Sequence, residues 1–193
     1  MRKFVVPFLA IAVLFLGAAS AFANTITVTF PDPGSFTYLG SGDASVTYSG
    51  VTFSTQSALG NSNFFLIGTG YGANPPDLSS QQETVGVANI LVTLPVYATY
   101  FSVNYGTFNG SPVTFLASNG LTATFGSTGS GYSTPDNVYY NGPAYNTMLI
   151  TSPDWVLNIS SISYTPVPEP GTLVMLGSGL LAAAGAFRRR FVA

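Results

Sequence analysis

The sequence predicts an all-β fold, an antiparallel β-sandwich of jelly-roll type, followed by a C-terminal single transmembrane helix. Three observations predict the sandwich. Short segments alternate apolar and polar residues with a period of two, they are rich in β-branched and aromatic residues, and clusters of Gly, Asn, Pro and Ser separate them at short intervals. No stretch between the two ends of the chain has helical periodicity.

The expected strands follow one another through residues 24–165, which we take as one β-sandwich domain. Alternation is clearest in 26–30, 101–105 and 113–117. Further candidates are residues 44–48, 50–55, 62–67, 84–94, 121–126, 137–140, 146–151 and 155–164. About ten short strands in one domain favour two packed antiparallel sheets, with a closed barrel as the alternative.

Two local features refine this prediction. Asn119-Gly120 separates two alternating segments and fits the two-residue loop of a type I′ hairpin. In the last segment, Trp155, Leu157 and Ile159 are spaced two residues apart, which predicts a final stripe of side chains facing the core.

The N-terminus has the anatomy of a secretory signal peptide. Arg2-Lys3 precedes an apolar stretch at residues 4–17, and a small-x-small cleavage site follows. The residues that define this site are Ala21, Ala23 and Asn24. We therefore expect signal peptidase to remove residues 1–23.

The C-terminus, residues 166–193, has three ordered parts. They are the motif Val167, Pro168, Glu169 and Pro170, an apolar stretch at 171–187, and the basic residues Arg188, Arg189 and Arg190. At about 1.5 Å per residue the apolar stretch spans roughly 25 Å as a helix, a marginal membrane span. Basic residues beside a span favour the cytoplasmic side. The arginines should act as a membrane stop, with the body outside.

This ordered tail resembles the PEP-CTERM sorting signal of Gram-negative bacteria over about residues 166–191; the body resembles no family that we recognise. The resemblance implies that an exosortase, a membrane transpeptidase, recognises the region around Glu169, removes the helix and releases or transfers the body. The cytoplasmic membrane is then a transient partner, and the mature protein lies at the cell surface or outside the cell. Polysaccharide is a candidate partner, because such organisms often produce exopolysaccharide. The alternative is a plain tail-anchored surface protein.

The charged side chains of the body differ from those of the two ends of the chain. Residues 24–165 contain no Lys, Arg or His and hold six acids, a side-chain charge of −6. These acids are Asp32, Asp43, Asp77, Glu83, Asp136 and Asp154. Because nucleic-acid binding requires cations that neutralise phosphates, nucleic acid is excluded as a partner. Cysteine is absent, so the domain must be stabilised by its core rather than by disulfides.

The composition predicts a protein that is not an enzyme. The body lacks His, Cys and Lys, which removes the usual bases and nucleophile activators and excludes zinc or copper sites built from imidazole or thiolate. A pair of carboxylates, as in glycoside hydrolases, is the remaining catalytic option, and nothing in the spacing of the acids selects a pair. No cofactor is expected. Calcium stays open at Asp43 or Asp136-Asn137, against the simpler role of keeping the surface anionic.

Aromatic residues offer the remaining indication of function. Five tyrosines fall in or near Gly, Pro and Asn-rich segments and could form a glycan-contacting rim, since tyrosine offers an apolar ring with a hydroxyl. They are Tyr71, Tyr132, Tyr139, Tyr140 and Tyr145. Packing within strands is the simpler explanation. Three functions therefore remain: an exported non-enzymatic surface or matrix protein, a lectin-like binding module, and a glycan-processing hydrolase.

Overall fold

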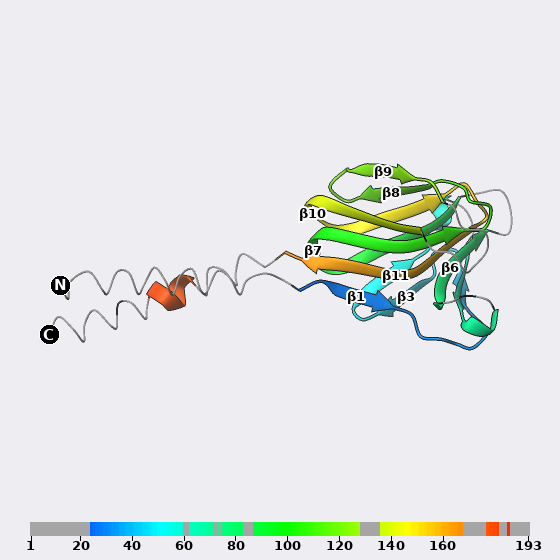
Figure 1. The fold of residues 1–193 in the computed structure, drawn as a ribbon, viewed down its shortest axis with the longest axis horizontal. Helices are drawn as coiled ribbons and strands as arrows, with labels where there is room; N and C mark the ends of the chain where they lie inside the picture. The colour runs from blue at the N-terminus through cyan, green and yellow to red at the C-terminus, as the bar shows by residue number, and fades with distance from the viewer. Residues whose placement is uncertain are drawn as a thin grey trace. The chain divides into compact units, whose positions relative to one another are not determined.

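Within the part of the chain that the computed structural model describes, eleven β-strands and two short 3-10 helices form the body (Figure 1). The described residues are 24–59, 62–71, 73, 75–82, 87–127, 136–167, 177–181 and 185. In chain order the elements are β1 (Ile26–Thr29), β2 (Phe36–Ser41), β3 (Ser45–Tyr48), β4 (Val51–Ser54), η1 (Ser57–Leu59), β5 (Ser62–Ile67), η2 (Thr69–Tyr71), β6 (Asp77–Gln82), β7 (Ala88–Thr107), β8 (Val113–Ala117), β9 (Thr122–Phe125), β10 (Asp136–Ser152) and β11 (Val156–Pro166).

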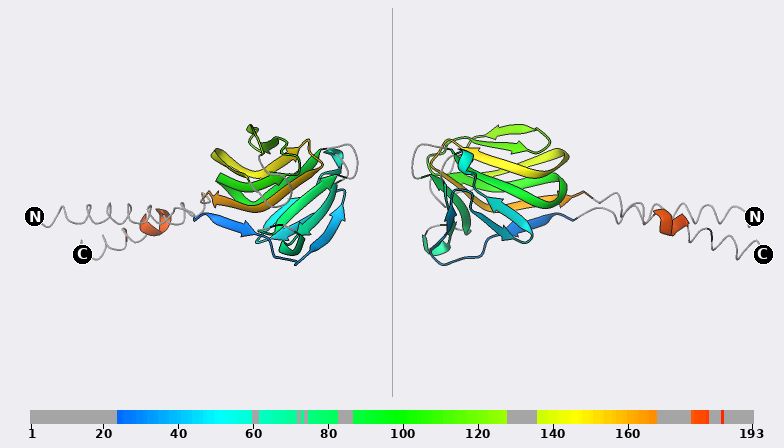
Figure 2. Two further views of the ribbon diagram at one scale, coloured as in Figure 1. Left: turned by 45° about the vertical axis from the view of Figure 1, so that its right-hand side comes forward. Right: turned by 180° about the vertical axis from the view of Figure 1, so that it is seen from behind.

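Two long strands, β7 and β10, run through both layers of the sandwich (Figure 2). The first half of β7 and the second half of β10 pair with each other and continue through β4 and β3 on one side and β8 and β9 on the other. Their other halves pair beside β11, which continues through β6, β5 and β2 and also pairs with β1. All pairs are antiparallel, and the crossed strand order is that of a jelly roll.

Prolines mark the corners at which β7 and β10 pass from one layer to the other. The β7–β10 register shifts between the pairs Tyr145↔Ala98 and Thr147↔Thr93, which leaves Pro95 without a partner on β10. Pro143 falls in the neighbouring shift on β10. Since proline cannot donate a ladder hydrogen bond, it is tolerated at such irregular positions and not within a regular central strand.

The core lies between the two layers. It contains side chains from both sheets, among them Phe53, Phe64, Ile90 and Phe101, all essentially inaccessible to solvent. Every core residue in the described chain lies between Val28 and Tyr164, so the compact unit Thr25–Pro166 carries a core of its own. Pairing of Ile26 with Tyr164 brings the two ends of this body to the same side.

The predicted antiparallel sandwich of jelly-roll type is confirmed. The sequence prediction did not include two of the strands, β2 and β6. β2 is flanked by glycines and largely exposed, while β6 contains Leu78 as its single aliphatic residue, so neither gives an alternating apolar pattern. Predicted segments 101–105 and 137–140 are parts of the long strands β7 and β10, because a strand that changes layers carries two alternation patterns.

The hairpin between β8 and β9 is present, but its turn type was predicted wrongly. Gly120 N donates to Ala117 O and Ala117 N donates to Leu121 O, both at 2.9 Å, which defines a three-residue loop. Only Gly120, with φ of 85°, has positive φ in this loop, as in a type I turn followed by a bulge. The type I′ pair is Ser49-Gly50 instead, with φ of 49° and 80°.

Most of the two predicted terminal signals lies outside the described residues. This holds for Ala21, Ala23, Pro168, Glu169, Pro170, Arg188, Arg189 and Arg190. Residues 177–181 and 185 are helical. Within the described part of the chain, no helix is both long enough and apolar enough to cross a membrane, and the span at 171–187 stays a prediction.

Candidate aromatic binding site

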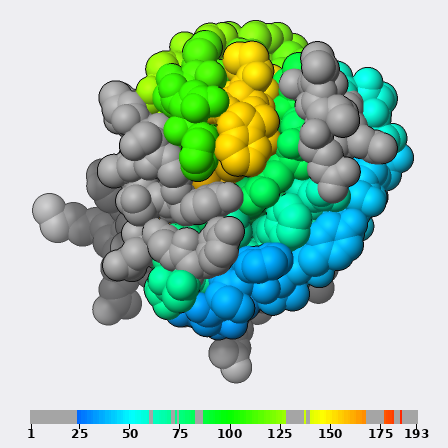
Figure 3. Space-filling view, turned by 90° about the vertical axis from the view of Figure 1, so that its right-hand side faces the viewer, coloured from blue at the N-terminus to red at the C-terminus, as the bar shows by residue number. Residues whose placement is uncertain are grey.

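Phe108 and Trp155 form an exposed aromatic pair on the body, which we call the aromatic platform. Phe108 directly follows β7 and Trp155 directly precedes β11. They are 37% and 42% exposed, their ring centroids are 4.7 Å apart and the rings are tilted by 56°. Figure 3 shows the green segment at the end of β7 beside the yellow segment before β11 on this surface.

A buried carboxylate fixes the backbone under the platform. Asp154 is 3% exposed, and its Oδ2 accepts from the backbone N of Asn109 at 2.5 Å. Its Oδ1 accepts from Asn109 Nδ2 at 3.1 Å and from the backbone N of Trp155 at 2.7 Å. In addition, Gln82 N donates to Trp155 O at 2.7 Å. Both aromatic residues are therefore attached to backbone held by charge-assisted hydrogen bonds.

The sequence prediction placed Trp155 in the core, and this was wrong. Leu157 and Ile159 do face the core, with 0% exposure. Trp155 lies before the first residue of β11, in the turn that Asp154 stabilises, so the alternation of the strand does not extend to it. The sequence contains a single tryptophan, and its position beside Pro153-Asp154 was the signal that could have indicated a turn.

A second group of exposed aromatic residues lies on β2 and β5, which we call the aromatic strip. Phe36 and Tyr38 are 52% and 54% exposed, and their ring centroids lie 5.9 Å and 5.4 Å from that of Phe65. The strip lies on the edge strand β2 and its neighbour β5, and Asp32 joins the segments next to these strands through hydrogen bonds from Gly34 and Thr69.

Of the five tyrosines in the predicted rim, the structure describes the side chains of Tyr140 and Tyr145. Tyr145 is completely buried and contacts Phe101 and Tyr140 in the core, because the bulge near Pro143 turns its ring inward; as a ligand contact it was wrong. Tyr140 is half-buried, and its hydroxyl accepts from Asn119 Nδ2 at 3.3 Å. Tyr132 and the side chains of Tyr71 and Tyr139 lie outside the described residues.

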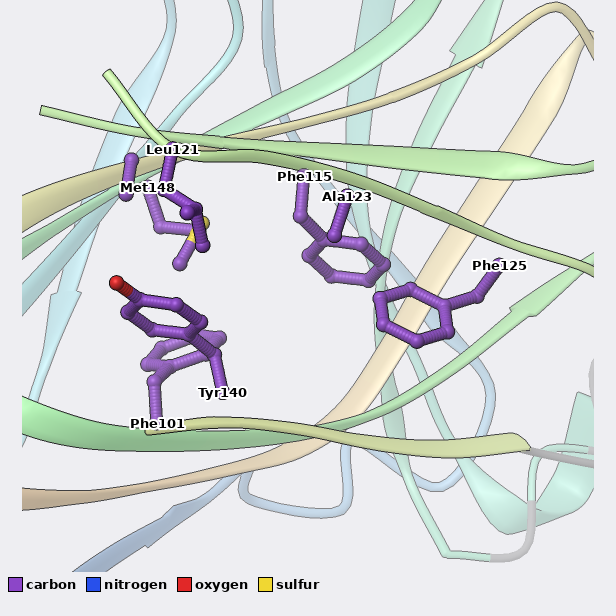
Figure 4. A pocket seen from close by; sticks show the side chains of 8 residues that line it. Phe101, Phe115, Leu121, Ala123, Phe125, Tyr140 and Met148 are labelled. Atoms are coloured by element: carbon purple, nitrogen blue, oxygen red, sulfur yellow. The ribbon is translucent and has the colours of Figure 1, made fainter. Parts of the chain in front are cut away.

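Tyr140 also lines a small apolar pocket at the edge of the core (Figure 4). The other lining residues are Phe101, Phe115, Ala117, Leu121, Ala123, Phe125 and Met148. In Figure 4 the Tyr140 and Phe101 rings lie on the side opposite Met148 and Leu121. The cavity volume of about 30 Å³ holds no more than a few water molecules, which is too little for a sugar ring.

The described exposed acids have local structural roles. Asp32 accepts from Gly34 N at 2.8 Å and from Thr69 N and Oγ1, and these bonds lower its pKa. Asp43, one of the predicted calcium candidates, accepts from the N and Oγ of Ser57, both at 2.8 Å, which lowers its pKa.

The other predicted calcium candidate, Asp136-Asn137, begins β10. Asn137 Oδ1 accepts from Ser102 Oγ at 2.9 Å, while the side chain of Asp136 lies outside the described residues. Among the residues that the structure describes, no three His, Cys, Asp or Glu side chains gather as a metal site.

Comparison with known families confirms the resemblance of the C-terminal tail. Residues 166–190 match the PEP-CTERM protein-sorting motif. The chain thus carries the sorting signal of PEP-CTERM proteins, which implies an exported protein that is processed at the membrane. This match lies almost entirely beyond the sandwich, and no curated protein matches the chain significantly.

Several solved structures match this chain at low similarity. A variant of a family 29 carbohydrate-binding module has a TM-score of 0.41 and 8% identity, and covers 68% of this chain and 85% of that one. A family 6 module from Cellvibrio mixtus lichenase 5A, solved with cellotriose, has a TM-score of 0.26 and 18% identity, and covers 67% and 98%. Because these TM-scores are below 0.5, neither module indicates a ligand for this chain.

Proposed function

We propose that this chain is an exported, non-enzymatic surface or matrix protein whose body binds neutral polysaccharide through the aromatic platform of Phe108 and Trp155. An exosortase acts at the sorting signal around Glu169 before the body reaches its final place. The observation that carries the proposal is the exposed Trp155 ring, held against Phe108 by the Asp154 network. A fixed aromatic face suits a sugar ring, whose apolar face can stack on it.

The position of the platform supports this role. Trp155 precedes the first residue of β11, whereas the last residue of that strand, Pro166, begins the sorting signal. Eleven strand residues span roughly 36 Å at about 3.3 Å each. The platform is therefore at the end of the body that is remote from its C-terminal connection.

The charge of the body supports a neutral ligand. Residues 24–165 have six acids and no cationic side chain, so an anionic polysaccharide would meet repulsion without any compensating ion pair. The absence of cationic side chains does not weaken the binding of a neutral polysaccharide. Binding through stacking and neutral hydrogen bonds should also change little with salt, because few charges contribute to it.

The proposal is tested by affinity electrophoresis and a glycan array with the isolated body, residues 24–166. We expect saturable binding to neutral polysaccharide, a loss on the order of tenfold or more in Trp155→Ala, and a smaller loss in Phe108→Ala. Tyr97→Ala is the matched control, because Tyr97 is 58% exposed and lies at the distant corner of β7. Equal binding by Trp155→Ala and the unchanged body, or no binding to any glycan, would contradict the proposal.

A further inference from the structure

A buried polar cluster lies on the side of β6 and β11 that faces away from the core. Its members are Asp77, Ser79, Asn158 and Ser160, with exposures of 4%, 0%, 2% and 2%. Ser79 is paired with Asn158, Asp77 lies two residues before Ser79 on β6, and Ser160 lies two residues after Asn158 on β11, at a register shift in the pairing of β11 with β7. Directly opposed side chains on antiparallel strands, such as those of Ser79 and Asn158, have Cβ atoms about 4.5–5.5 Å apart, and Asp77 and Ser160 flank this pair.

The cluster has oxygen atoms without partners. Asn158 Oδ1 and Nδ2 and Ser160 Oγ are buried and form no hydrogen bond with the residues that the structure describes. Buried polar atoms are nearly always paired with protein or with a bound species. Ser79 Oγ accepts from Gln81 Nε2 at 3.3 Å and keeps a further lone pair. The available atoms are thus mainly carboxylate, amide and hydroxyl oxygens, the donor set that hard cations use.

The Asp77 carboxylate has no cationic side chain in the body with which to pair. Residues 24–165 contain no Lys, Arg or His, so no side chain of the body can form an ion pair with it. No hydrogen bond among the described residues reaches it, whereas the equally buried Asp154 accepts three. A buried carboxylate without such compensation takes up either a proton or a metal cation.

We propose that Asp77, Asn158 and Ser160, with Ser79 beside them, form a calcium site on the outer side of the β6–β11 pair. Asp77 supplies the one negative charge, Asn158 Oδ1 and Ser160 Oγ supply neutral ligands, and water completes the coordination. With a single carboxylate the affinity is in the range of extracellular modules, a Kd of roughly 10⁻⁴ to 10⁻³ M. This range suits a protein that is exported, and the site is independent of the aromatic platform.

The test is isothermal titration of the body, residues 24–166, with CaCl₂, together with its thermal midpoint in calcium and in chelator. We expect one bound ion and a higher midpoint in calcium for the unchanged body. Asp77→Asn should abolish both effects, and Asn158→Ala or Ser160→Ala should weaken binding about tenfold. Asp43→Asn is the matched control, since it removes an exposed carboxylate of equal charge and should leave the titration unchanged.

Each outcome of these measurements either supports or overturns the calcium site. Loss of calcium binding in Asp77→Asn and its retention in Asp43→Asn support the site. Absence of any heat or midpoint shift in the unchanged body at 10⁻² M calcium, on the order of ten times the weakest expected Kd, overturns it. Full binding by Asp77→Asn does the same. If Asp77→Asn does not fold, the calcium affinities of Asn158→Ala and Ser160→Ala, which keep the carboxylate, test the site. Unchanged calcium binding by both variants overturns it.

Discussion

Asp154 and Asp77 are buried to the same degree, at 3% and 4% exposure, in a body that has no cationic side chain. Asp154 accepts hydrogen bonds from the backbone and side chain of Asn109 and from the backbone of Trp155. Asp77 accepts none within the described structure, and burial raises its pKa to about 7. The two regions show two ways in which a body without cationic side chains accommodates a buried carboxylate.

The difference lies in local geometry. Asp154 is in a turn, where free backbone N–H groups are close and point at the carboxylate, so that the acid stabilises the turn and the platform on it. Asp77 begins β6, where the backbone groups are already paired with β5. A carboxylate on a regular strand finds no free backbone donor. It then depends on a proton or on an ion from solution.

The largest expected effect comes from Asp77→Asn in chelator. The variant replaces the carboxyl by a neutral amide of the same shape, and a pKa raised from 3.8 to about 7 corresponds to an upper limit of about 4 kcal/mol at pH 8. We expect urea denaturation at pH 8 to show a higher free energy of unfolding for Asp77→Asn. A lower one would mean that the carboxylate has a stabilising partner.

The same substitution has a pH signature. Between pH 3.8 and about 7 the folded Asp77 carboxyl holds a proton that the unfolded chain has released, so the free energy of unfolding falls as the pH rises through this range and is flat above it. Asp77→Asn should remove this slope. Asp32 and Asp43, whose pKa values are lowered, act in the opposite sense, with stability lost as the pH falls below 3.8.

The next effect, in the opposite direction, comes from Asp154→Ala. Loss of this acceptor leaves the N–H groups of Asn109 and Trp155 without their partner, and we expect a decrease of about 3 kcal/mol in the free energy of unfolding. Asp154→Asn keeps one acceptor oxygen and should lose less. Denaturation curves of the two variants measure the difference, and near-identical stability of Asp154→Ala and the unchanged body would show that the network does not hold the platform.

The smallest expected effect comes from Tyr145→Phe, a variant that distinguishes the role of the buried tyrosine from that of the aromatic platform. The buried hydroxyl of Tyr145 has no hydrogen-bond partner among the described residues, and burial raises its pKa. Tyr145→Phe should therefore increase the free energy of unfolding by about 1 kcal/mol. Glycan binding should stay the same, because this ring is enclosed by the core. If Tyr145→Phe lost as much glycan binding as Trp155→Ala, Tyr145 would be part of the ligand-binding site.

Much of the fold could be predicted from the sequence because alternation reports the core directly, as in β8, where Val113, Phe115 and Ala117 are buried. The corners at Pro95 and Pro143 could not, since they depend on how two long strands bend together. Charge composition indicated which ligands to exclude. It could not locate the platform, because Phe108 and Trp155 are 47 positions apart in the sequence (155 − 108) and meet only through the Asp154 turn.

The most direct test of polysaccharide binding at the platform is the fluorescence of the body, residues 24–166, titrated with neutral polysaccharide. Trp155 is the single tryptophan in the sequence, so its emission reports the platform alone. We expect a saturable blue shift, as a sugar ring covers the 42% exposed indole, and little change of the curve with salt. Binding that is detected by electrophoresis but leaves the tryptophan emission unchanged would contradict it.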